Sequence, residues 1–273
     1  MSAIEALDVE FRYGSHLAIA ASSFTVPEAA ITALIGPNGS GKSTILNGIA
    51  GLIEPSSGSL TVYQAATRRR VALVLQTTKV NDALPITVRE VVSMARYASA
   101  GDFTRLTEAD TEMVDQAMER MSIMNLAMRH LSELSGGQRQ RVFVAQGLAQ
   151  DHDILLLDEP LTGLDLPSAQ AIDDVIHDEQ RRGRTIVMST HDLAEARIAD
   201  HVILVAGRVI ASGTPKSVLT APNLREAYGP ALLHMEGEQI FLDDPAHQTT
   251  DGLHLHQGRS IHVEAIHEDG AKH

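Results

Sequence analysis

The feature that most constrains this chain is a glycine-rich segment between an apolar run and a helical pattern. Residues 36–44 read GPNGSGKST and match the phosphate-binding pattern G-x-x-x-x-G-K-[ST]. Residues 30–35 are nearly all apolar, as in a buried strand, and residues 42–52 have helical spacing. Glycines let backbone N–H groups converge, and a helix N-terminus adds free amides and partial positive charge. We therefore expect a nucleotide phosphate site made by Gly36, Pro37, Asn38, Gly39, Ser40, Gly41, Lys42, Ser43 and Thr44.

Two side chains of this loop add chemistry that the backbone lacks. Lys42 can reach the β- and γ-phosphates of a nucleoside triphosphate. The hydroxyl of Ser43 can bind Mg²⁺, which prefers hard oxygen ligands. A glycine-rich turn that matches the pattern by chance is the alternative, and the flanking strand and helix argue against it.

Two acidic residues end a second apolar strand. Residues 154–157 are Ile-Leu-Leu-Leu, and Asp158 and Glu159 follow them. The carboxyl edge of a parallel sheet is where open α/β folds bind ligands. We expect Asp158 to hold Mg²⁺ through its water shell and Glu159 to orient or deprotonate an attacking water. Such a base contributes about 10²–10⁴-fold in rate. A solvated strand end is the alternative, which the phosphate loop disfavours.

The order of the predicted elements indicates an α/β fold, a P-loop NTPase core. Strands alternate with helices, which implies a mostly parallel sheet covered on both faces. The predicted strands of this sheet include 71–75, 154–157, 185–189 and 202–205, and helices are predicted at 167–182 and 193–199. Residues 87–98 and 107–121 have apolar residues at helical spacing, which predicts a helical subdomain inserted at about 86–150. The first 30 residues alternate as in strands, and we expect them to form an antiparallel N-terminal β subdomain.

Composition excludes several classes of protein. The net charge of −13 argues against nucleic acid as a partner, because an acidic surface repels phosphate backbones. The absence of Cys excludes disulfides and thiolate metal sites. No signal peptide is visible, and no apolar run approaches the roughly 18–20 residues of a membrane helix. If the protein serves transport, another chain must form the pore.

A further set of motifs follows the order found in one large family. Ser135, Gly136, Gly137 and Gln138 form a Ser-Gly-Gly-Gln sequence about 20 residues before the acid pair. This sequence resembles the signature motif of the ATP-binding cassette (ABC) ATPases. Together with the phosphate loop, it makes the chain similar to that family. Four further positions are similar to the family's other marks: Gln76 to the Q-loop glutamine, Asp165 to the D-loop, His191 to the switch histidine, and Tyr13 to the aromatic residue that stacks on adenine.

The resemblance implies a mechanism and a set of partners. ATP and Mg²⁺ would bind the phosphate loop, with the metal on Ser43, Gln76 and, through water, Asp158. Two copies of the chain would form a homodimer in which the signature motif of one caps the ATP of the other. Glu159 would polarise the attacking water, and His191 would contact the γ-phosphate. Such a subunit lies at the cytoplasmic face of the membrane, bound to integral membrane permease subunits and served by a periplasmic or extracellular solute-binding protein.

Within the family, the sequence resembles the zinc/manganese-uptake branch. Residues 83–97 read ALPITVREVVSMARY, close to that branch's P-[IV]-T-V-R-[DE]-V-V stretch, although Ala95 replaces its usual Gly. The NLREAYG sequence at 223–229 is similar to the same branch, whereas Gln146 and Gly147 replace the more frequent Arg-Ala. Import of iron chelates or cobalamin is the alternative. A soluble ABC ATPase of DNA repair or translation fits less well with one cassette and an acidic surface. A P-loop kinase or GTPase would leave the signature motif and His191 without a purpose.

The last part of the chain differs in composition from the rest. We assign 1–230 to the ATPase domain and 231–273 to a His-rich C-terminal extension, which contains more than half of the 13 His residues. His254 and His256 would lie on one face of a strand and could chelate Zn²⁺ weakly. A polar tail with scattered His residues is the interpretation we favour. Unchanged zinc binding and metal-dependent ATPase activity after removal of residues 251–273 would exclude a regulatory zinc site.

Overall fold

A computed structural model of the chain describes residues 1–63, 70–76, 85–100, 106–229, 233–236 and 239–242. The chain divides into one unit from Met1 to Leu242 and a second from Asp243 to His273. The second unit, with His254 and His256, lies outside the described residues, as do residues 83–84 of the branch-specific stretch. The predicted division at residue 230 therefore stays a prediction.

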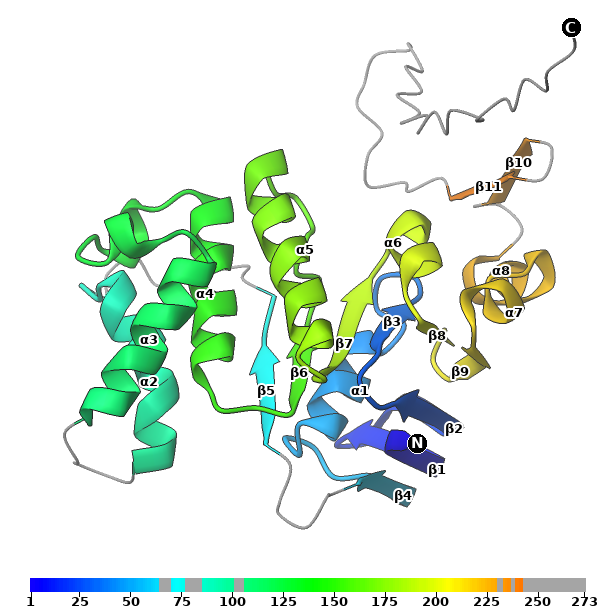
Figure 1. The fold of residues 1–273 in the computed structure, drawn as a ribbon. Helices are drawn as coiled ribbons and strands as arrows, with labels where there is room; N and C mark the ends of the chain where they lie inside the picture. Colours follow the sequence, from blue (N-terminus) through cyan, green and yellow to red (C-terminus); the bar gives the residue numbers. More distant parts are fainter. Residues whose placement is uncertain (64–69, 77–84, 101–105, 230–232, 237–238, 243–273) are drawn as a thin grey trace, which may run out of the picture. The chain divides into compact units, whose positions relative to one another are not determined.

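A six-stranded sheet forms the centre of the first unit (Figure 1). Its strand order is β5-β6-β7-β3-β8-β9, and only the pairing of β8 with β9 is antiparallel. The strands are β3 (Ile31–Ile35), β5 (Val71–Val74), β6 (Ile154–Leu157), β7 (Thr185–Thr190), β8 (His201–Val205) and β9 (Val209–Gly213). Every residue of β3, β6 and β7 is buried, because these strands are covered on both faces, and most of their side chains are apolar. The prediction of an α/β fold with a mostly parallel sheet is confirmed.

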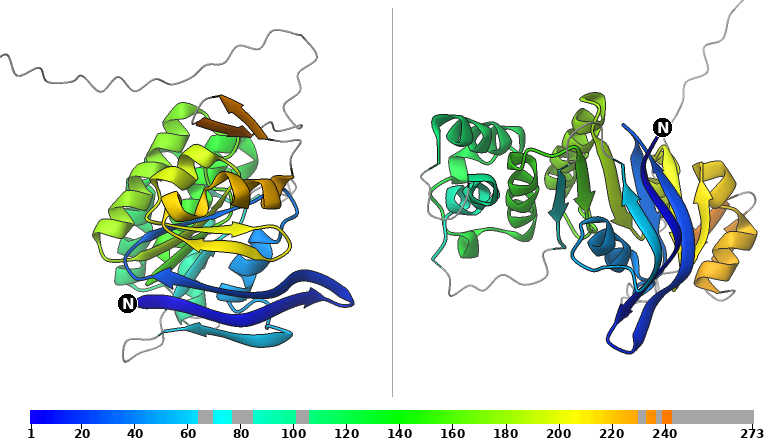
Figure 2. Two further views of the ribbon diagram at one scale, coloured as in Figure 1. Left: turned by 90° about the vertical axis from the view of Figure 1, so that its right-hand side faces the viewer. Right: turned by 90° about the horizontal axis from the view of Figure 1, so that it is seen from below.

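Alternate residues of the central strands face two separate cores. Leu34, Leu156 and Val187 pack with Ile45 of α1 (Lys42–Ile49) and with the N-terminal strands. Ile35, Leu157 and their neighbours on the other face pack against the remaining helices. These include α5 (Leu166–Arg181), α6 (Leu193–Ile198), α7 (Pro215–Val218) and α8 (Ala221–Tyr228). The two cores give the layered arrangement that Figure 2 shows from two directions.

The N-terminal strands form the expected antiparallel sheet, with the order β2-β1-β4. It consists of β1 (Ser2–Tyr13), β2 (His16–Pro27) and β4 (Ser57–Val62). Phe11 of β1 lies against α1 so closely that a Cβ on Gly48 would be 2.4 Å from its ring. This contact fixes the small sheet, and the turn at Tyr13, against the helix that follows the phosphate loop.

The inserted segment is helical, as its periodicity predicts. It contains α2 (Val88–Ala100), α3 (Glu108–Arg120), α4 (Gly136–Ala149) and the short 3-10 turns Met124–Leu126 and Leu131–Glu133. Arg96 of α2 bridges the other two helices: its Nε is 2.9 Å from Asp110 Oδ1, and its Nη1 donates to the carbonyl of Ala149 at 3.1 Å. The three helices therefore form one packed group, which Figure 1 shows beside the β5 edge of the sheet.

Some elements were not predicted, and each lacks a strong pattern. Strand β4 is mostly exposed, strand β9 has no fully buried residue, and α7 spans four residues. A hairpin of β10 (Leu233–Glu236) and β11 (Gln239–Leu242) follows α8. Helix α1 ends at Ile49, earlier than the predicted residue 52, because Gly51 adopts a φ of 73°. Among the described residues, no helix has both the length and the apolar character needed to span a membrane.

Candidate nucleotide site

The phosphate loop connects the carboxyl end of β3 to the first turn of α1. Gly41 precedes the helix with a φ of 101°, so its position favours glycine, and it gives α1 no side-chain cap. The first amides of the helix are therefore left for an external anion. Gly36 lies against β8, where a Cβ would be 2.0 Å from the Val205 carbonyl oxygen. The glycines that the sequence pattern requires are thus explained by close backbone approach and by positive φ.

Lys42 lies folded over this loop. Its Nζ donates to the carbonyl oxygens of Gly36 at 2.8 Å and Pro37 at 3.1 Å, and the residue is only 5% exposed. Burial lowers the pKa of Lys42, and the carboxylates of Glu159 and Asp158 oppose that shift. The ammonium group can exchange the two carbonyls for phosphate oxygens without a new backbone arrangement. Its contact with the β- and γ-phosphates stays a prediction.

The acid pair lies at the carboxyl end of β6, and one serine of β7 organises it. The hydroxyl of Ser189 donates to Asp158 Oδ1 at 2.6 Å and accepts the backbone N–H of Glu159 at 2.8 Å. Glu159 has a φ of 46°, an uncommon conformation for a residue with a side chain. The parallel register places β7 beside β6, which brings Ser189 to this point. Sequence reasoning treated Ser189 only as a strand end and missed this role.

Three predicted residues from separate strands meet at one carboxylate oxygen. Gln76 Nε2 donates to Glu159 Oε2 at 2.9 Å, and His191 Nδ1 lies 3.8 Å from the same oxygen. Gln76 follows β5, Glu159 follows β6, and His191 follows β7, which are neighbours in the sheet. A carboxylate held in this way is placed to accept a proton from a water beside a bound phosphate.

A cavity of about 510 Å³ connects these groups. Besides the loop residues from Asn38 to Thr44, it is lined by Tyr13, His16, Ala18, Gln76 and Glu159. Tyr13 is half exposed, so its ring is free to stack on a base. His16 was missed by the sequence analysis, because only the β1–β2 turn, which pairs it with Tyr13, brings it to the cavity. Asp158 and His191 are not lining residues, but they contact Ser189 and Glu159, respectively.

The residues of the signature motif are not part of this cavity. Ser135 caps α4: its Oγ accepts the N–H of Gln138 at 3.3 Å, and the Gln138 side chain accepts the N–H of Ser135 at 3.1 Å. Ser135 and Gly136 are exposed, whereas Gly137 packs against the first turn of α5. Asp165 caps α5 by accepting the N–H of Ser168 at 2.8 Å, a bond that lowers its pKa. One chain therefore does not bring Ser135 or Asp165 to its own phosphate loop.

The chemistry of the available ligands fits a magnesium ion. Ser43 and Gln76 line the cavity with a hydroxyl and an amide oxygen, and Asp158 contributes a carboxylate at the adjacent strand end. These are hard oxygen ligands of the kind that Mg²⁺ binds, with waters completing its shell. The part of the chain that the structure describes contains no group of three or more His, Asp or Glu residues that could hold a metal ion by themselves.

The fold and the site define an ATPase of the P-loop class, and comparison with known proteins gives its family. The family model described as ABC transporter matches residues 19–162. The chain belongs to the ABC transporter family: it is an ATP-binding and ATP-hydrolysing subunit. Members of this family work with membrane permease components, which the described part of this chain does not supply.

Several relatives belong to metal transport systems. The manganese transport system ATP-binding protein MntA of Synechocystis is 36% identical over 221 residues, covering 79% of this chain and 85% of MntA. The zinc transport system ATP-binding protein TroB of Treponema pallidum is 41% identical over 208 residues, covering 75% and 78%. The chelated iron transport system membrane protein YfeB of Yersinia pestis is 37% identical over 235 residues, covering 84% and 79%.

Solved structures agree with the fold. An inward-facing structure of an ABC transporter described as of the metal-chelate type has a TM-score of 0.75 and 26% identity. The match covers 88% of this chain and 96% of that one. The resemblance to ABC ATPases that the motifs indicated is therefore confirmed.

Proposed function

We propose that this chain powers the import of zinc or manganese. It works as a homodimer at the cytoplasmic face of the membrane, beneath integral permease subunits that receive the ion from a periplasmic or extracellular binding protein. The proposal of ATP hydrolysis at this site depends above all on one observation. The carboxylate of Glu159 lies at the edge of the phosphate cavity, where it accepts a hydrogen bond from Gln76 and lies 3.8 Å from His191. The choice of metal is supported by the names of MntA and TroB.

Each residue of the site has a role that follows from its position. The loop amides and Lys42 bind the phosphates, and the Tyr13 ring stacks on adenine. Glu159 accepts a proton from the attacking water, while His191 contacts the γ-phosphate. Mg²⁺, when bound by Ser43, Gln76 and Asp158, neutralises charge on the phosphate oxygens. Gln76 lies at the catalytic edge and precedes the helical segment in the sequence. It is therefore placed to transmit a change in the bound nucleotide to the permease.

The homodimer follows from what a single chain leaves incomplete. Ser135 and the free amides at the start of α4 form an anion-binding helix terminus, yet they lie outside the chain's own cavity. In a two-fold dimer, the signature motif of one subunit covers the ATP of its partner, and both sites are completed together. An isolated chain should then hydrolyse ATP slowly at low protein concentration.

Transport into proteoliposomes tests the proposed cargo. The chain is reconstituted with the permease subunits that copurify with it from membranes, and ATP-dependent uptake of zinc, manganese, ferric chelate and cobalamin is compared. Glu159→Gln provides the control for uptake that does not need hydrolysis. Uptake of zinc or manganese alone supports the proposal. Uptake confined to ferric chelate or cobalamin establishes instead the alternative, which the similarity to YfeB supports for iron.

A further inference from the structure

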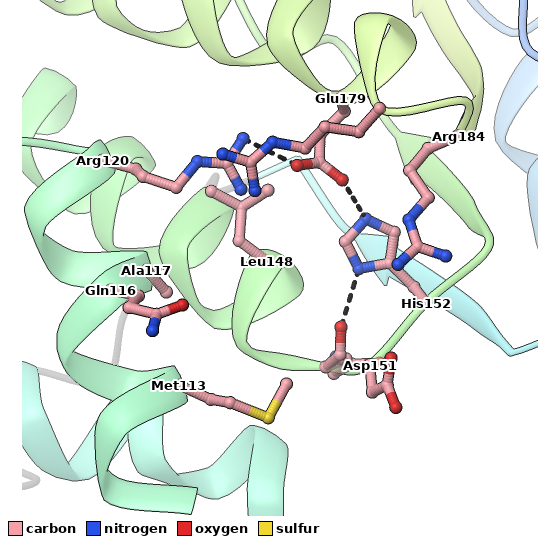
Figure 3. Close-up of a pocket in the computed structure, with 11 residues that line it drawn as sticks. Met113, Gln116, Ala117, Arg120, Leu148, Asp151, His152, Glu179 and Arg184 are labelled. Carbon is pink, nitrogen blue, oxygen red and sulfur yellow. Dashed lines mark hydrogen bonds and ion pairs between the residues drawn. The ribbon is translucent and has the colours of Figure 1, made fainter. Parts of the chain in front are cut away.

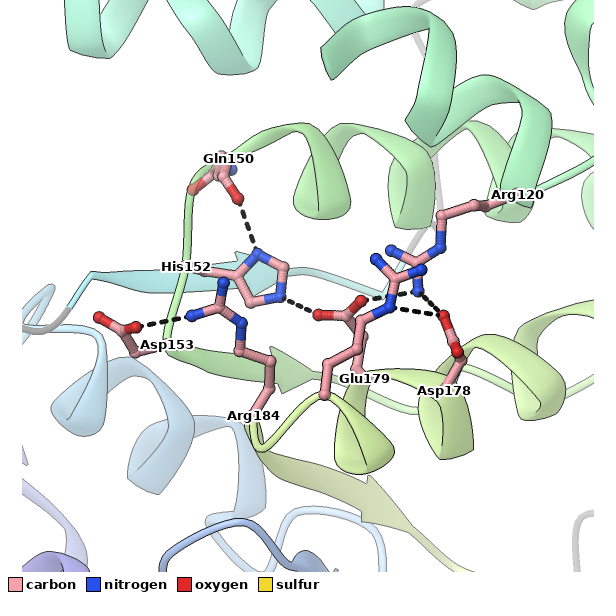
Figure 4. Close-up of polar contacts among 8 residues, drawn as sticks. Arg120, Gln150, His152, Asp153, Asp178, Glu179 and Arg184 are labelled. Atoms are coloured by element: carbon pink, nitrogen blue, oxygen red, sulfur yellow. Dashed lines mark hydrogen bonds and ion pairs between the residues drawn. The ribbon is translucent and has the colours of Figure 1, made fainter.

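A buried histidine outside the nucleotide site lies in the turn between α4 and β6. His152 is 4% exposed, and both of its ring nitrogens have a polar partner. Nδ1 is 2.7 Å from the carbonyl oxygen of Gln150, and Nε2 is 2.9 Å from Glu179 Oε2 on α5 (Figure 4). His152 has no role in ATP binding and does not belong to a family motif, so neither explains this arrangement.

The two partners determine the protonation state of the ring. A carbonyl oxygen only accepts hydrogen bonds, so Nδ1 must carry a proton. Glu179 Oε1 is 2.6 Å from Arg120 Nη2, which favours the ionised carboxylate. Since an ionised carboxylate also only accepts, Nε2 must donate as well, and the ring is an imidazolium.

The charged groups join three parts of the chain. Arg120 belongs to α3 of the helical segment, His152 to the turn after α4, and Glu179 to α5 of the core. Arg120 Nη2 also contacts Asp178 Oδ2 at 2.7 Å, and Arg182 Nε lies 3.0 Å from the same oxygen. Removing one partner from such a buried group leaves an uncompensated charge, which strongly destabilises the folded state.

This cluster holds the end of the helix that begins with the signature motif. Helix α4 runs from Gly136 to Ala149, and Gln150, which accepts the bond from His152, is its C-terminal cap. With about 1.5 Å per residue, a small change of direction at this end displaces Ser135 at the other end, roughly 20 Å away. We infer that doubly protonated His152 is a positioning residue that holds α4, and with it the signature motif, in the orientation needed for hydrolysis. This inference rests on the proposed role of the signature motif in a dimer.

Loss of the proton would leave one ring N–H for two acceptors. A cavity of about 140 Å³ beside the cluster, lined also by Met113 and Gln116, lets solvent approach His152 (Figure 3). The charged groups around His152 on every neighbouring element are Arg70, Arg120, Asp151, Asp153, Asp178, Glu179, Arg182 and Arg184. Because the protonated form is the one that holds α4, turnover should fall as pH rises.

The first test compares the pH dependence of ATP hydrolysis by the full-length protein. In the wild type, kcat should fall on the alkaline side in a step that involves one proton. His152→Gln, which cannot carry the charge, should lower kcat about tenfold at neutral pH and remove that step. KM for ATP should change less than about twofold, because the phosphate loop is untouched. An alkaline step that persists in His152→Gln, or an unchanged kcat, would overturn the inference.

His177→Gln is the matched control. His177 lies on α5 close in sequence to Glu179, but its side chain is 40% exposed and bonds the Asp173 carbonyl of its own helix. Its removal should leave kcat and the pH profile unchanged. A loss equal to that of His152→Gln would show that any change near α5 has this effect, and the inference would fail.

The second test does not depend on turnover. In a ¹⁵N spectrum of histidine side chains at neutral pH, His152 should show two protonated ring nitrogens. Its signal is identified by its absence from His152→Gln or, if that protein does not fold, by its shift in Glu179→Gln. A neutral tautomer overturns the inference. A protein that transports no metal yet shows the imidazolium and the pH step refutes only the proposed cargo, so the two failures are distinguishable.

Discussion

Replacing Glu159 by Gln tests the proposed hydrolytic site most directly. The substitution keeps the size of the side chain and can keep a contact with Gln76, now 2.9 Å from Glu159 Oε2. It removes the group that accepts a proton, whose contribution is about 10²–10⁴-fold, or about 3–5 kcal/mol of transition-state stabilisation. We therefore expect kcat to fall by at least about 100-fold.

Nucleotide binding should survive this change. The loop amides, Lys42 and Tyr13 do not depend on the Glu159 carboxylate for their position, so the Kd for ATP should stay within about threefold. Since ATP then persists, the variant should accumulate as a dimer in ATP and Mg²⁺. Phosphate release, nucleotide fluorescence and size-exclusion chromatography measure the three quantities.

An exposed acid outside the site provides the control for loss of charge. Glu54 lies in the loop after α1, is exposed and has no role in the cavity, so Glu54→Gln should hydrolyse ATP at the wild-type rate. Wild-type turnover by Glu159→Gln would refute the assignment of the base. A comparable loss in Glu54→Gln would show that the assay reports charge and not catalysis.

Three other perturbations follow from the same contacts. Ser189→Ala leaves the acid pair without its hydroxyl partner, and thermal denaturation should show a loss of about 1–3 kcal/mol together with slower turnover; unchanged values of both would exclude the orienting role. Tyr13→Ala should raise KM for ATP several-fold with little change in kcat, whereas Tyr13→Phe should retain the wild-type KM, and equal effects of the two would argue against stacking. Burial raises the pKa of Glu179, but its contacts with His152 and Arg120 lower that pKa to about 2 in the folded chain. The ionised carboxylate therefore stabilises the fold at neutral pH, and this contribution is lost as pH falls from about 5 toward 2. Urea titrations should show a shallower acid loss in Glu179→Gln than in the wild type, and parallel curves would contradict the lowered pKa.

Several features of the protein were determined by local sequence alone. The phosphate loop could be predicted because its glycines and the Lys that follows Gly41 must lie within one short stretch of chain to surround one phosphate group. The buried strands were predicted because burial on both faces requires a run of apolar residues. The helices of the insert were predicted because burial of one face requires apolar residues with a 3.6-residue period. The type and order of these elements were sufficient to predict the fold class. Weakly buried elements such as β4 and β9 have too little apolar periodicity to be predicted.

Other features exist only because the sheet has a particular strand order. Gln76, Glu159 and His191 are far apart in sequence, and the adjacency of β5, β6 and β7 places them around one oxygen atom. Ser189 reaches the acid pair through the register of β6 with β7, which no spacing of residues along the chain encodes. The charge on His152 likewise depends on Glu179, which only the packing of α5 against the turn after α4 brings within hydrogen-bond distance. Local sequence thus determined which chemical groups the chain carries, and tertiary packing decided which of them share a proton, because hydrogen bonds require contact within about 3 Å.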